Sequence, residues 1–163
     1  MRLSRIVAIL FALGAALASG CSQQGQQNAQ GDWPSYGLNG AETRQSPLDQ
    51  ITPQTVNALK PAWYADLTHI SNRAFEATPL VIDGVLYVST GWSNALAFDG
   101  KTGKQLWHHD PQVPKDWAAK ACCGPVSRGL GYADGRLFLA TLDGRLIAID
   151  AKSGKPLWTT QTF

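Results

Sequence analysis

The sequence predicts an all-β fold built from repeated sheets, because one stretch of the chain recurs without a gap at an offset of fifty-one residues. This offset places Asp83-Gly84 on Asp134-Gly135 and, further along, Lys101–Lys104 on Lys152–Lys155. The Asp-Gly pairs are typical of β-hairpin turns, since glycine tolerates the positive φ that these turns require. No long amphipathic helical pattern is apparent. We therefore expect short antiparallel strands joined by tight turns.

Each repeat, at about residues 79–107 and 130–158, contains three or four short β-rich runs. The strands expected from these runs are Leu80–Ile82, Val85–Ser89, Arg136–Thr141 and Leu146–Asp150. A further short strand closes each repeat at Trp107 or Trp158. Sheets of this size and spacing match the blades of a β-propeller. We expect both tryptophan rings to wedge between neighbouring blades, where an indole buries a large apolar area.

The repeats account for only part of a closed ring. Residues 32–163 hold two blades and a fraction of a third, whereas a propeller closes with about four to eight blades. Blades without neighbours leave apolar faces open. We therefore expect this partial propeller to be the amino-terminal part of a longer protein or a truncated gene product. Upstream of the repeats, a short helical turn is expected at Pro53–Leu59, with Thr52 as its cap.

The first twenty residues have the pattern of a secretory signal peptide. Arg2 and Arg5 precede the apolar run Ile6–Ala18, which is too short to span a membrane. Small residues then precede Cys21, as in bacterial lipoproteins, so we expect lipidation at Cys21, with simple cleavage as the alternative. Residues 21–31 are mostly Gln, Ser, Asn and Gly and are expected to form a flexible tether. The predicted location is the periplasm, with Cys21 as the membrane anchor.

Charge and spacing argue against several classes of partner. The chain has fourteen basic and twelve acidic side chains, and two arginines leave with the signal peptide. The remainder is close to neutral, which argues against nucleic acid or an acidic polymer as a partner. No His/Cys cluster has the spacing of metal ligands. Adjacent histidines on an extended segment point opposite ways, which argues against a metal site at His108–Asp110. This run follows Trp107 and leads to Pro111, so we expect a loop there.

Cys122 and Cys123 are adjacent, which is unusual for a structural disulfide. Their Cα atoms are held about 3.8 Å apart, below the usual disulfide range of about 4.4–6.8 Å. A bond between them would strain the peptide and close almost no loop, so the stabilisation that grows with loop length would be nearly absent. Such a ring would serve through its shape or its redox chemistry, and an exported protein permits it. The alternative is two buried thiols that never pair.

Several segments resemble the start of the pyrroloquinoline-quinone-dependent alcohol dehydrogenases. They are Asp32–Gly37, Ser46–Leu48, Ile51–Trp63, Phe75–Val81, the cysteine doublet with Arg128-Gly129, and Gly144–Asp150. The resemblance covers about residues 32–163. It implies an eight-bladed propeller with the quinone on its axis and calcium beside it. It also implies an enzyme that oxidises primary alcohols to aldehydes and passes electrons to a periplasmic cytochrome c or a quinone.

The resemblance implies which residues contact the quinone. Glu76 matches the glutamate that hydrogen-bonds the cofactor, and Arg128 matches the arginine at its polar edge. A guanidinium offers planar, bidentate geometry to carboxylates. Cys122 and Cys123 match a vicinal disulfide that stacks on one face of the quinone. The calcium ligands and the catalytic aspartate belong to later blades of the family, so they are expected beyond residue 163, and this chain alone is expected to be inactive.

One stretch departs from the family pattern. Gly124–Ser127 stands where members usually carry an acidic or polar residue and then an asparagine before the arginine. Because proline fixes φ and lacks a donor, we expect the approach of Arg128 to the cofactor to differ. The alternative function is a non-enzymatic propeller lipoprotein, similar to the outer-membrane β-barrel-assembly scaffold. The cysteine doublet and Glu76 favour the enzyme, because a scaffold has no need for them.

Overall fold

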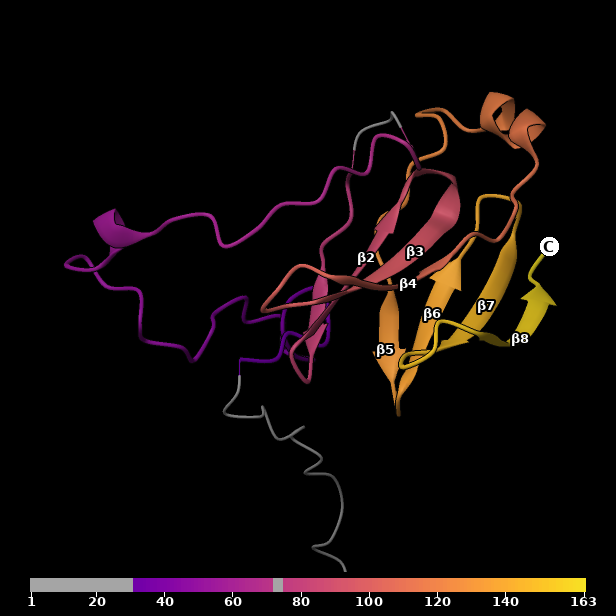
Figure 1. Cartoon of the computed structure of the whole chain (residues 1–163). Helices are drawn as coiled ribbons and strands as arrows, with labels where there is room; N and C mark the ends of the chain where they lie inside the picture. Colours follow the sequence, from indigo (N-terminus) through magenta and orange to yellow (C-terminus); the bar gives the residue numbers. More distant parts are fainter. Residues whose placement is uncertain (1–30, 72–74) are drawn as a thin grey trace, which may run out of the picture.

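A computed structural model of the chain describes residues 31–71 and 75–163. The described part contains two four-stranded antiparallel sheets, with strand orders β1-β2-β3-β4 and β5-β6-β7-β8 (Figure 1). This confirms the predicted all-β class and supplies two of the expected two to three blades. The predicted signal peptide (residues 1–20), Cys21 and nearly all of the tether lie outside the described residues. Within the described ranges, no helix is long and apolar enough to cross a membrane.

Each sheet uses its strands in chain order. The first sheet contains β1 (Leu80–Ile82), β2 (Val85–Thr90), β3 (Asn94–Asp99) and β4 (Gln105–His109). The second sheet contains β5 (Gly131–Ala133), β6 (Arg136–Ala140), β7 (Arg145–Asp150) and β8 (Pro156–Gln161). The four strands predicted from β-rich runs all form, with ends within one residue of those expected. The last strand of each sheet continues past its tryptophan.

The first turn of each sheet is set by its Asp-Gly pair. Asp83 and Gly84 have φ of 50° and 74°, and Asp134 and Gly135 have φ of 48° and 74°. Two successive positive φ values are the signature of the type I′ hairpin turn, whose twist matches that of the strands it joins. The turns predicted from these dipeptides are therefore confirmed.

The later turn of each sheet is held by an aspartate. The Asp99 carboxylate accepts hydrogen bonds from the backbone and the hydroxyl of Thr102, both at 2.7 Å. Asp150 accepts the same pair from Ser153, at 2.8 and 2.6 Å. These hydrogen bonds favour the ionised carboxylates and so lower the pKa of both aspartates. A bulge after Ala97 in the first sheet recurs after Ala148 in the second.

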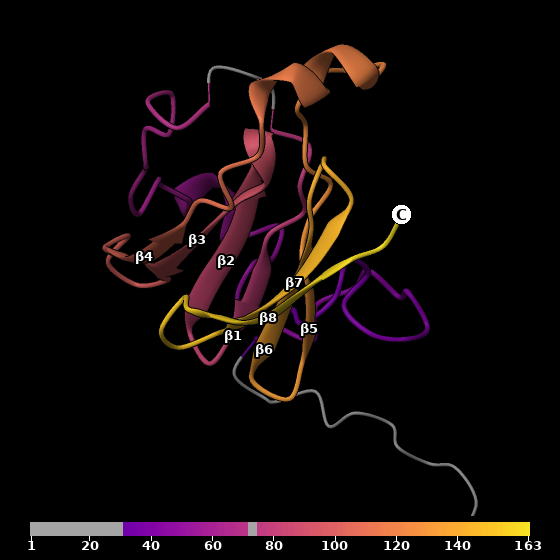
Figure 2. The same ribbon diagram turned by 90° about the vertical axis from the view of Figure 1, so that its right-hand side faces the viewer.

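One apolar core joins the two sheets, which stand side by side in Figure 2. It includes Leu80 and Tyr87 of the first sheet and Leu137, Leu139 and Ile149 of the second. All five side chains are 6% exposed or less. Burying one such side chain contributes about 1.5–3 kcal/mol. The shared core therefore holds the two blades together as a unit.

A tryptophan also connects the sheets, as predicted for Trp107. Its indole N–H donates to the Ala151 carbonyl oxygen at 2.9 Å, and its ring lies against Gly154. Trp158, at the corresponding position of the second sheet, is 43% exposed, and its ring lies tilted against Phe138 of its own sheet, with 6.1 Å between the ring centroids. The prediction for Trp107 is therefore confirmed, whereas Trp158 has no neighbouring blade among the described residues.

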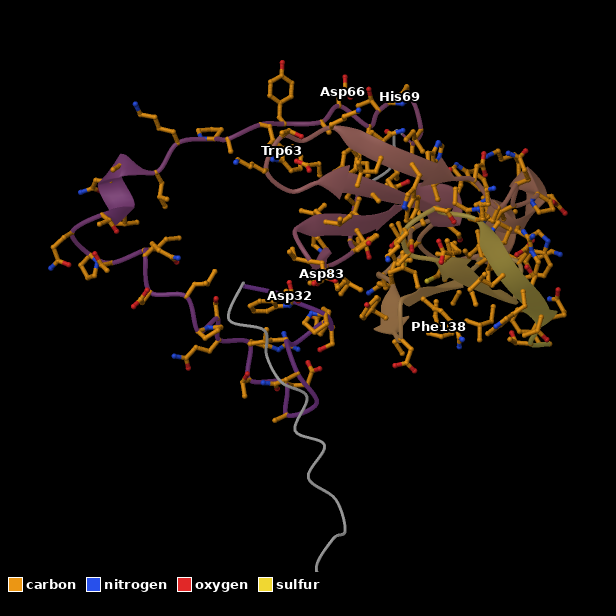
Figure 3. The ribbon with its side chains drawn as sticks, turned by 60° about the horizontal axis from the view of Figure 1, so that its bottom comes forward. Asp32, Trp63, Asp66, His69, Asp83 and Phe138 are labelled. Atoms are coloured by element: carbon orange, nitrogen blue, oxygen red, sulfur yellow. The ribbon has the colours of Figure 1, made fainter. Side chains whose placement is uncertain are left out.

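The segment before the first sheet extends away from it and returns (Figure 1). Trp33 pairs with Val81 of β1 through backbone hydrogen bonds of 2.7 and 3.0 Å. The Asp32 carboxylate accepts a hydrogen bond from the Asp83 N–H at 3.0 Å, and Figure 3 shows the two residues together. Trp63, near the other end of the segment, donates its indole N–H to the Gly100 carbonyl oxygen at 3.0 Å.

The helical turn expected at Pro53–Leu59 is shorter than predicted and begins later. The structure contains the 3-10 turn η1 (Val56–Ala58), whose cap position is Thr55 and not Thr52. The Thr55 hydroxyl donates to the Gln50 carbonyl oxygen, so it is engaged outside the turn. The predicted cap still makes a hydrogen bond, since the Thr52 hydroxyl accepts the Thr55 N–H at 3.3 Å. The Thr52 carbonyl also accepts the N–H groups of Thr55 and Val56.

Candidate functional site

The candidate site lies where two segments approach the first strands of the two sheets. Residues 75–79 lead into β1, and residues 121–130 lead into β5. Arg128 Nε lies 3.1 Å from Glu76 Oε2, and the two side chains are 75% and 36% exposed. A Cβ atom at Gly129 would lie 3.8 Å from the Thr78 carbonyl oxygen. The structure therefore brings together two residues that the sequence places fifty-two positions apart.

The cysteine doublet follows the short helical turn η3 (Lys115–Lys120), the orange turn near the top of Figure 1. The Sγ atoms of Cys122 and Cys123 lie 3.0 Å apart. Both residues are exposed free thiols in this structure, so the vicinal disulfide stays a prediction. The alternative of two buried thiols is wrong as to burial.

The charges of Glu76 and Arg128 influence the titration of the Cys123 thiol. The hydrogen bond between Cys123 and Cys122 is the main cause that raises the pKa of the Cys123 thiol. The Arg128 charge lowers this pKa and the Glu76 charge raises it. The ion pair and the cysteine doublet therefore lie close enough for both charges to influence Cys123.

Two hydrogen bonds fasten the segment between the cysteines and Arg128 to the first sheet. The Trp92 backbone N–H donates to the Pro125 carbonyl oxygen at 2.7 Å. The Ser127 hydroxyl donates to the Ser89 hydroxyl at 2.8 Å. Ser89 is 0% exposed and Ser127 is 8% exposed. A buried hydroxyl needs such a partner, because leaving it without one costs free energy.

Trp92 occupies an unusual backbone conformation in the short turn η2 (Gly91–Ser93). Its φ and ψ are 62° and 23°, in the left-handed region, and Ser93 follows with a φ of 57°. The Trp92 ring is covered by the Lys115 ammonium, 3.9 Å from its centroid. The Ser93 hydroxyl accepts the Leu142 N–H at 3.1 Å, which links η2 to the second sheet. This turn thus touches both the η3 region and the segment that carries Pro125.

Sequence reasoning did not identify Ser89, Trp92 or Ser127. Their contacts join positions more than twenty residues apart, and no local motif encodes that distance. One signal was present: Ser89 is two residues after Tyr87 in a strand, so it shares the inward face of that buried ring. A serine on an inward face predicts a buried hydroxyl that needs a partner.

The adjacent histidines form no metal centre in the described residues. The loop expected at His108–Asp110 is wrong, because His108 and His109 end strand β4. His108 Nε2 lies 2.7 Å from Asn94 Oδ1, while burial lowers the pKa of His109. No group of three or more His, Cys, Asp and Glu side chains in the described ranges could hold a metal ion.

The arrangement at residues 76 and 122–128 suits the binding of a flat anion. An exposed guanidinium can accept a carboxylate in a planar, bidentate manner. A neighbouring carboxylate can orient that guanidinium or accept a hydrogen bond. The two exposed sulfur atoms offer a polarisable surface beside them.

Comparisons with known proteins agree with this fold. A family model described as "Glucose/ethanol/alcohol dehydrogenase, beta-propeller domain", of the PQQ type, matches residues 33–159. The dehydrogenase subunit of the alcohol dehydrogenase (quinone) of Gluconobacter oxydans is 51% identical over 133 residues, covering 82% of this chain and 17% of that protein. The quinohemoprotein alcohol dehydrogenase ADH IIB of Pseudomonas putida is 44% identical over 165 residues, covering 99% of this chain and 24% of that protein.

A solved structure has a similar fold over most of this chain. The crystal structure of the quinohemoprotein alcohol dehydrogenase from Comamonas testosteroni matches with a TM-score of 0.78 and 45% identity, covering 82% of this chain and 20% of that one. The chain thus spans about a quarter or less of the length of these relatives. The family match covers most of the chain and includes Glu76, both cysteines and Arg128. The chain therefore belongs to the PQQ-dependent glucose/ethanol/alcohol dehydrogenase β-propeller family.

Proposed function

We propose that this chain supplies part of the pyrroloquinoline-quinone site of a periplasmic alcohol dehydrogenase that oxidises primary alcohols to aldehydes. The observation that carries the proposal is the Glu76–Arg128 ion pair beside the Cys122–Cys123 doublet. The names of the relatives support the activity, since they are alcohol dehydrogenases. One relative, from Thauera butanivorans, is named a 1-butanol dehydrogenase (cytochrome c).

The residues present fit a flat quinone that carries carboxylates. The Arg128 side chain is 75% exposed, so its guanidinium is open to a ligand. Its planar donors match a carboxylate better than a lysine ammonium would. Cys122 and Cys123 are exposed, so a flat face can lie against the two sulfur atoms. When bound, the quinone supplies the two-electron oxidising capacity that protein side chains lack.

Each residue has a separate role in this proposal. Arg128 binds a carboxylate at the edge of the quinone. Glu76 orients the guanidinium and accepts a hydrogen bond from the ligand. Cys122 and Cys123, joined as a vicinal disulfide in the oxidising periplasm, present a rigid ring to one face. A rigid ring loses little conformational entropy when the ligand binds, which favours affinity.

The other parts of the active site are proposed to lie outside this chain. The calcium ligands and the aspartate base would come from blades beyond residue 163, so this chain alone would be inactive. The electron acceptor would be a periplasmic cytochrome c or a quinone. Cys21 would carry a lipid that anchors the exported protein to the membrane.

The test is quinone binding by the intact protein that carries this chain. The apo protein is titrated with pyrroloquinoline quinone in the presence of calcium, and binding is followed by quenching of tryptophan fluorescence. Arg128→Gln is expected to weaken binding about tenfold or more, since a lost hydrogen bond to a charged group costs about 1.5–3 kcal/mol. Separately, Cys122→Ser with Cys123→Ser is expected to weaken binding because the rigid ring proposed to contact one face of the quinone cannot form.

A matched control is Arg136→Gln, which removes an exposed arginine at the start of β6, away from the site. This control is expected to bind the quinone as the wild type does. Wild-type affinity in both site variants would overturn the proposal.

A further inference from the structure

We propose that Ser89 and Ser127 are positioning residues for Arg128. Their buried hydroxyl–hydroxyl hydrogen bond sets the place of the guanidinium relative to Glu76, and thereby the affinity of the site for the quinone. This inference rests on the proposed function, because it concerns the same ligand.

The hydrogen bond lies directly beside the residue that it is proposed to position. Ser127 immediately precedes Arg128, and the two side chains have opposite environments: Ser127 is 8% exposed and the Arg128 side chain is 75% exposed. The adjacent side chains of Ser127 and Arg128 thus point one toward the interior and the other toward solvent. Fixing the inward hydroxyl of Ser127 therefore fixes the direction in which Arg128 leaves the surface.

The partner of Ser127 belongs to the sheet into which the Glu76 segment leads. Ser89 is in β2, which pairs with β1, and Glu76 lies four residues before β1. Arg128, in contrast, precedes β5 of the second sheet. The Ser89–Ser127 hydrogen bond thus ties the segment of the second blade to the blade that holds the carboxylate.

A second hydrogen bond also holds the segment before Arg128 to the first sheet and so fixes its orientation. The Pro125 carbonyl oxygen accepts the Trp92 N–H at 2.7 Å, two residues before Ser127. Gly91 permits this approach, because a Cβ there would lie 3.1 Å from the same carbonyl and would collide with the Ser71 hydroxyl. With two anchors, the short stretch from Pro125 to Ser127 cannot rotate about either one.

The buried hydrogen bond has more influence on this geometry than the ion pair itself. An exposed ion pair contributes little, because water screens it and two long side chains must be ordered. Breaking one side of a buried hydroxyl pair leaves the other without a partner in a place that water does not reach. The Glu76–Arg128 distance is therefore a consequence of the serine anchor more than its cause.

A set of three variants separates positioning from mere stability. Ser89→Ala and Ser127→Ala each leave one buried hydroxyl without its partner, so both should unfold at lower urea concentration. The double variant Ser89→Ala/Ser127→Ala removes both hydroxyls, and much of the stability should return. Alanine is smaller than serine, so the substituted side chains of all three variants fit in the space that the serines occupy.

Quinone affinity is expected to behave differently from stability. It should fall about tenfold in each single variant and stay about tenfold weaker in the double variant, since the anchor is absent from all three. The measurement is fluorescence titration of the intact apo protein with pyrroloquinoline quinone, beside urea unfolding of the same samples. A matched control is Thr141→Val, which removes a buried hydroxyl of the β6–β7 turn and should lower stability without changing the affinity.

The outcomes distinguish this inference from the proposed function. If the double variant binds the quinone as the wild type does while Arg128→Gln binds weakly, the serines are only structural and the inference is overturned alone. If Arg128→Gln itself binds as the wild type does, Arg128 does not hold the quinone and the inference fails. If the cysteine variant of the preceding section also binds as the wild type does, the proposed function fails with it. Weak binding by the double variant at nearly wild-type stability, with an unaffected Thr141→Val control, supports positioning.

Discussion

The indole N–H of Trp107 donates to the Ala151 carbonyl oxygen at 2.9 Å, joining the last strand of the first sheet to a turn of the second. Trp63 repeats this arrangement at the preceding junction, where its indole donates to the Gly100 carbonyl oxygen at 3.0 Å. In both places the ring lies against a glycine with positive φ. A tryptophan and a turn glycine thus form one unit at each junction. The glycine is needed for two reasons: it adopts a positive φ, and it has no Cβ that would collide with the indole ring.

Substitution of that glycine separates the two reasons. A Cβ at Gly154 (φ +71°) would lie 2.6 Å from the Trp107 ring, whereas a Cβ at Gly135 (φ +74°) would meet nothing within 4 Å. Gly135→Ala should therefore cost only the strain of a left-handed alanine, about 1–2 kcal/mol. Gly154→Ala should cost a further 1–3 kcal/mol or so, because the ring must move. Urea unfolding of the intact protein measures both, and equal losses would show that the ring can yield freely.

Replacing Arg128 by lysine tests whether the site needs a charge or a shape. The side chain is 75% exposed, so Arg128→Lys should change the free energy of unfolding by less than about 0.5 kcal/mol. Quinone affinity should nevertheless fall about tenfold, because an ammonium cannot make the planar, bidentate contact of a guanidinium. Titration with the quinone and urea unfolding on one preparation give both numbers. Full affinity with lysine would mean that charge alone is recognised.

The cysteine doublet should show an unusual pH dependence when it is reduced. The hydrogen bond with Cys122 raises the pKa of Cys123, and a raised pKa lowers the fraction of thiolate at any given pH. Since the thiolate is the reactive form, alkylation of Cys123 by iodoacetamide should rise at a higher pH than for an ordinary cysteine, whose pKa is about 8.5.

Cys122→Ala removes that hydrogen bond and should shift the alkylation profile of Cys123 to lower pH. Mass spectrometry of the reduced protein after timed alkylation at several pH values follows the modification. An unchanged profile in Cys122→Ala would show that the neighbouring thiol does not control the titration.

The blades could be predicted from the sequence because their signals are local. An Asp-Gly pair specifies a hairpin turn wherever it occurs between strands, and a fixed offset repeats it. Glu76 and Arg128 were found through segments that resemble a known family. Ser89 and Ser127 could not be paired in this way, because their hydrogen bond depends on how one blade lies on the other. Trp63 escaped the repeat alignment because it precedes Trp107 by a different interval than Trp107 precedes Trp158.

Local reasoning also failed where two assignments competed for one segment. Proline before a polar run favoured a helix start at Pro53, but the Thr55 hydroxyl binds the Gln50 carbonyl oxygen and the turn begins later. His108 and His109 were expected in a loop because Pro111 follows them. Pairing of Ala95 with His109 and Leu96 with His108 extends β4 to that point instead. In both cases longer-range hydrogen bonds decided the boundary.

Acid should weaken the contact between Asp143 and Arg145 in the β6–β7 turn. Arg145 Nη2 lies 2.7 Å from Asp143 Oδ2 and also donates to the Pro111 carbonyl oxygen at 2.9 Å, so the pair ties this turn to the segment after β4. Burial favours the neutral carboxyl, but hydrogen bonds from Arg145 and Thr141 outweigh it and lower the pKa of Asp143. A lowered pKa in the folded state means that the stability contribution is complete above the unfolded pKa, near 3.9, and is lost as the pH falls through the folded value.

Asp143→Asn should therefore lower the free energy of unfolding by about 1.5–3 kcal/mol at pH 7, the usual range for hydrogen bonds to a charged group. The difference from the wild type should shrink below about pH 4, because the wild-type carboxyl is then protonated in the unfolded state, and at still lower pH in the folded state as well. Urea unfolding at pH 7, 4 and 3 follows the difference, with the exposed Asp116→Asn as a control that should change nothing. A gap that stays constant down to pH 3 would mean that the shape of the asparagine, and not the charge of Asp143, accounts for the loss.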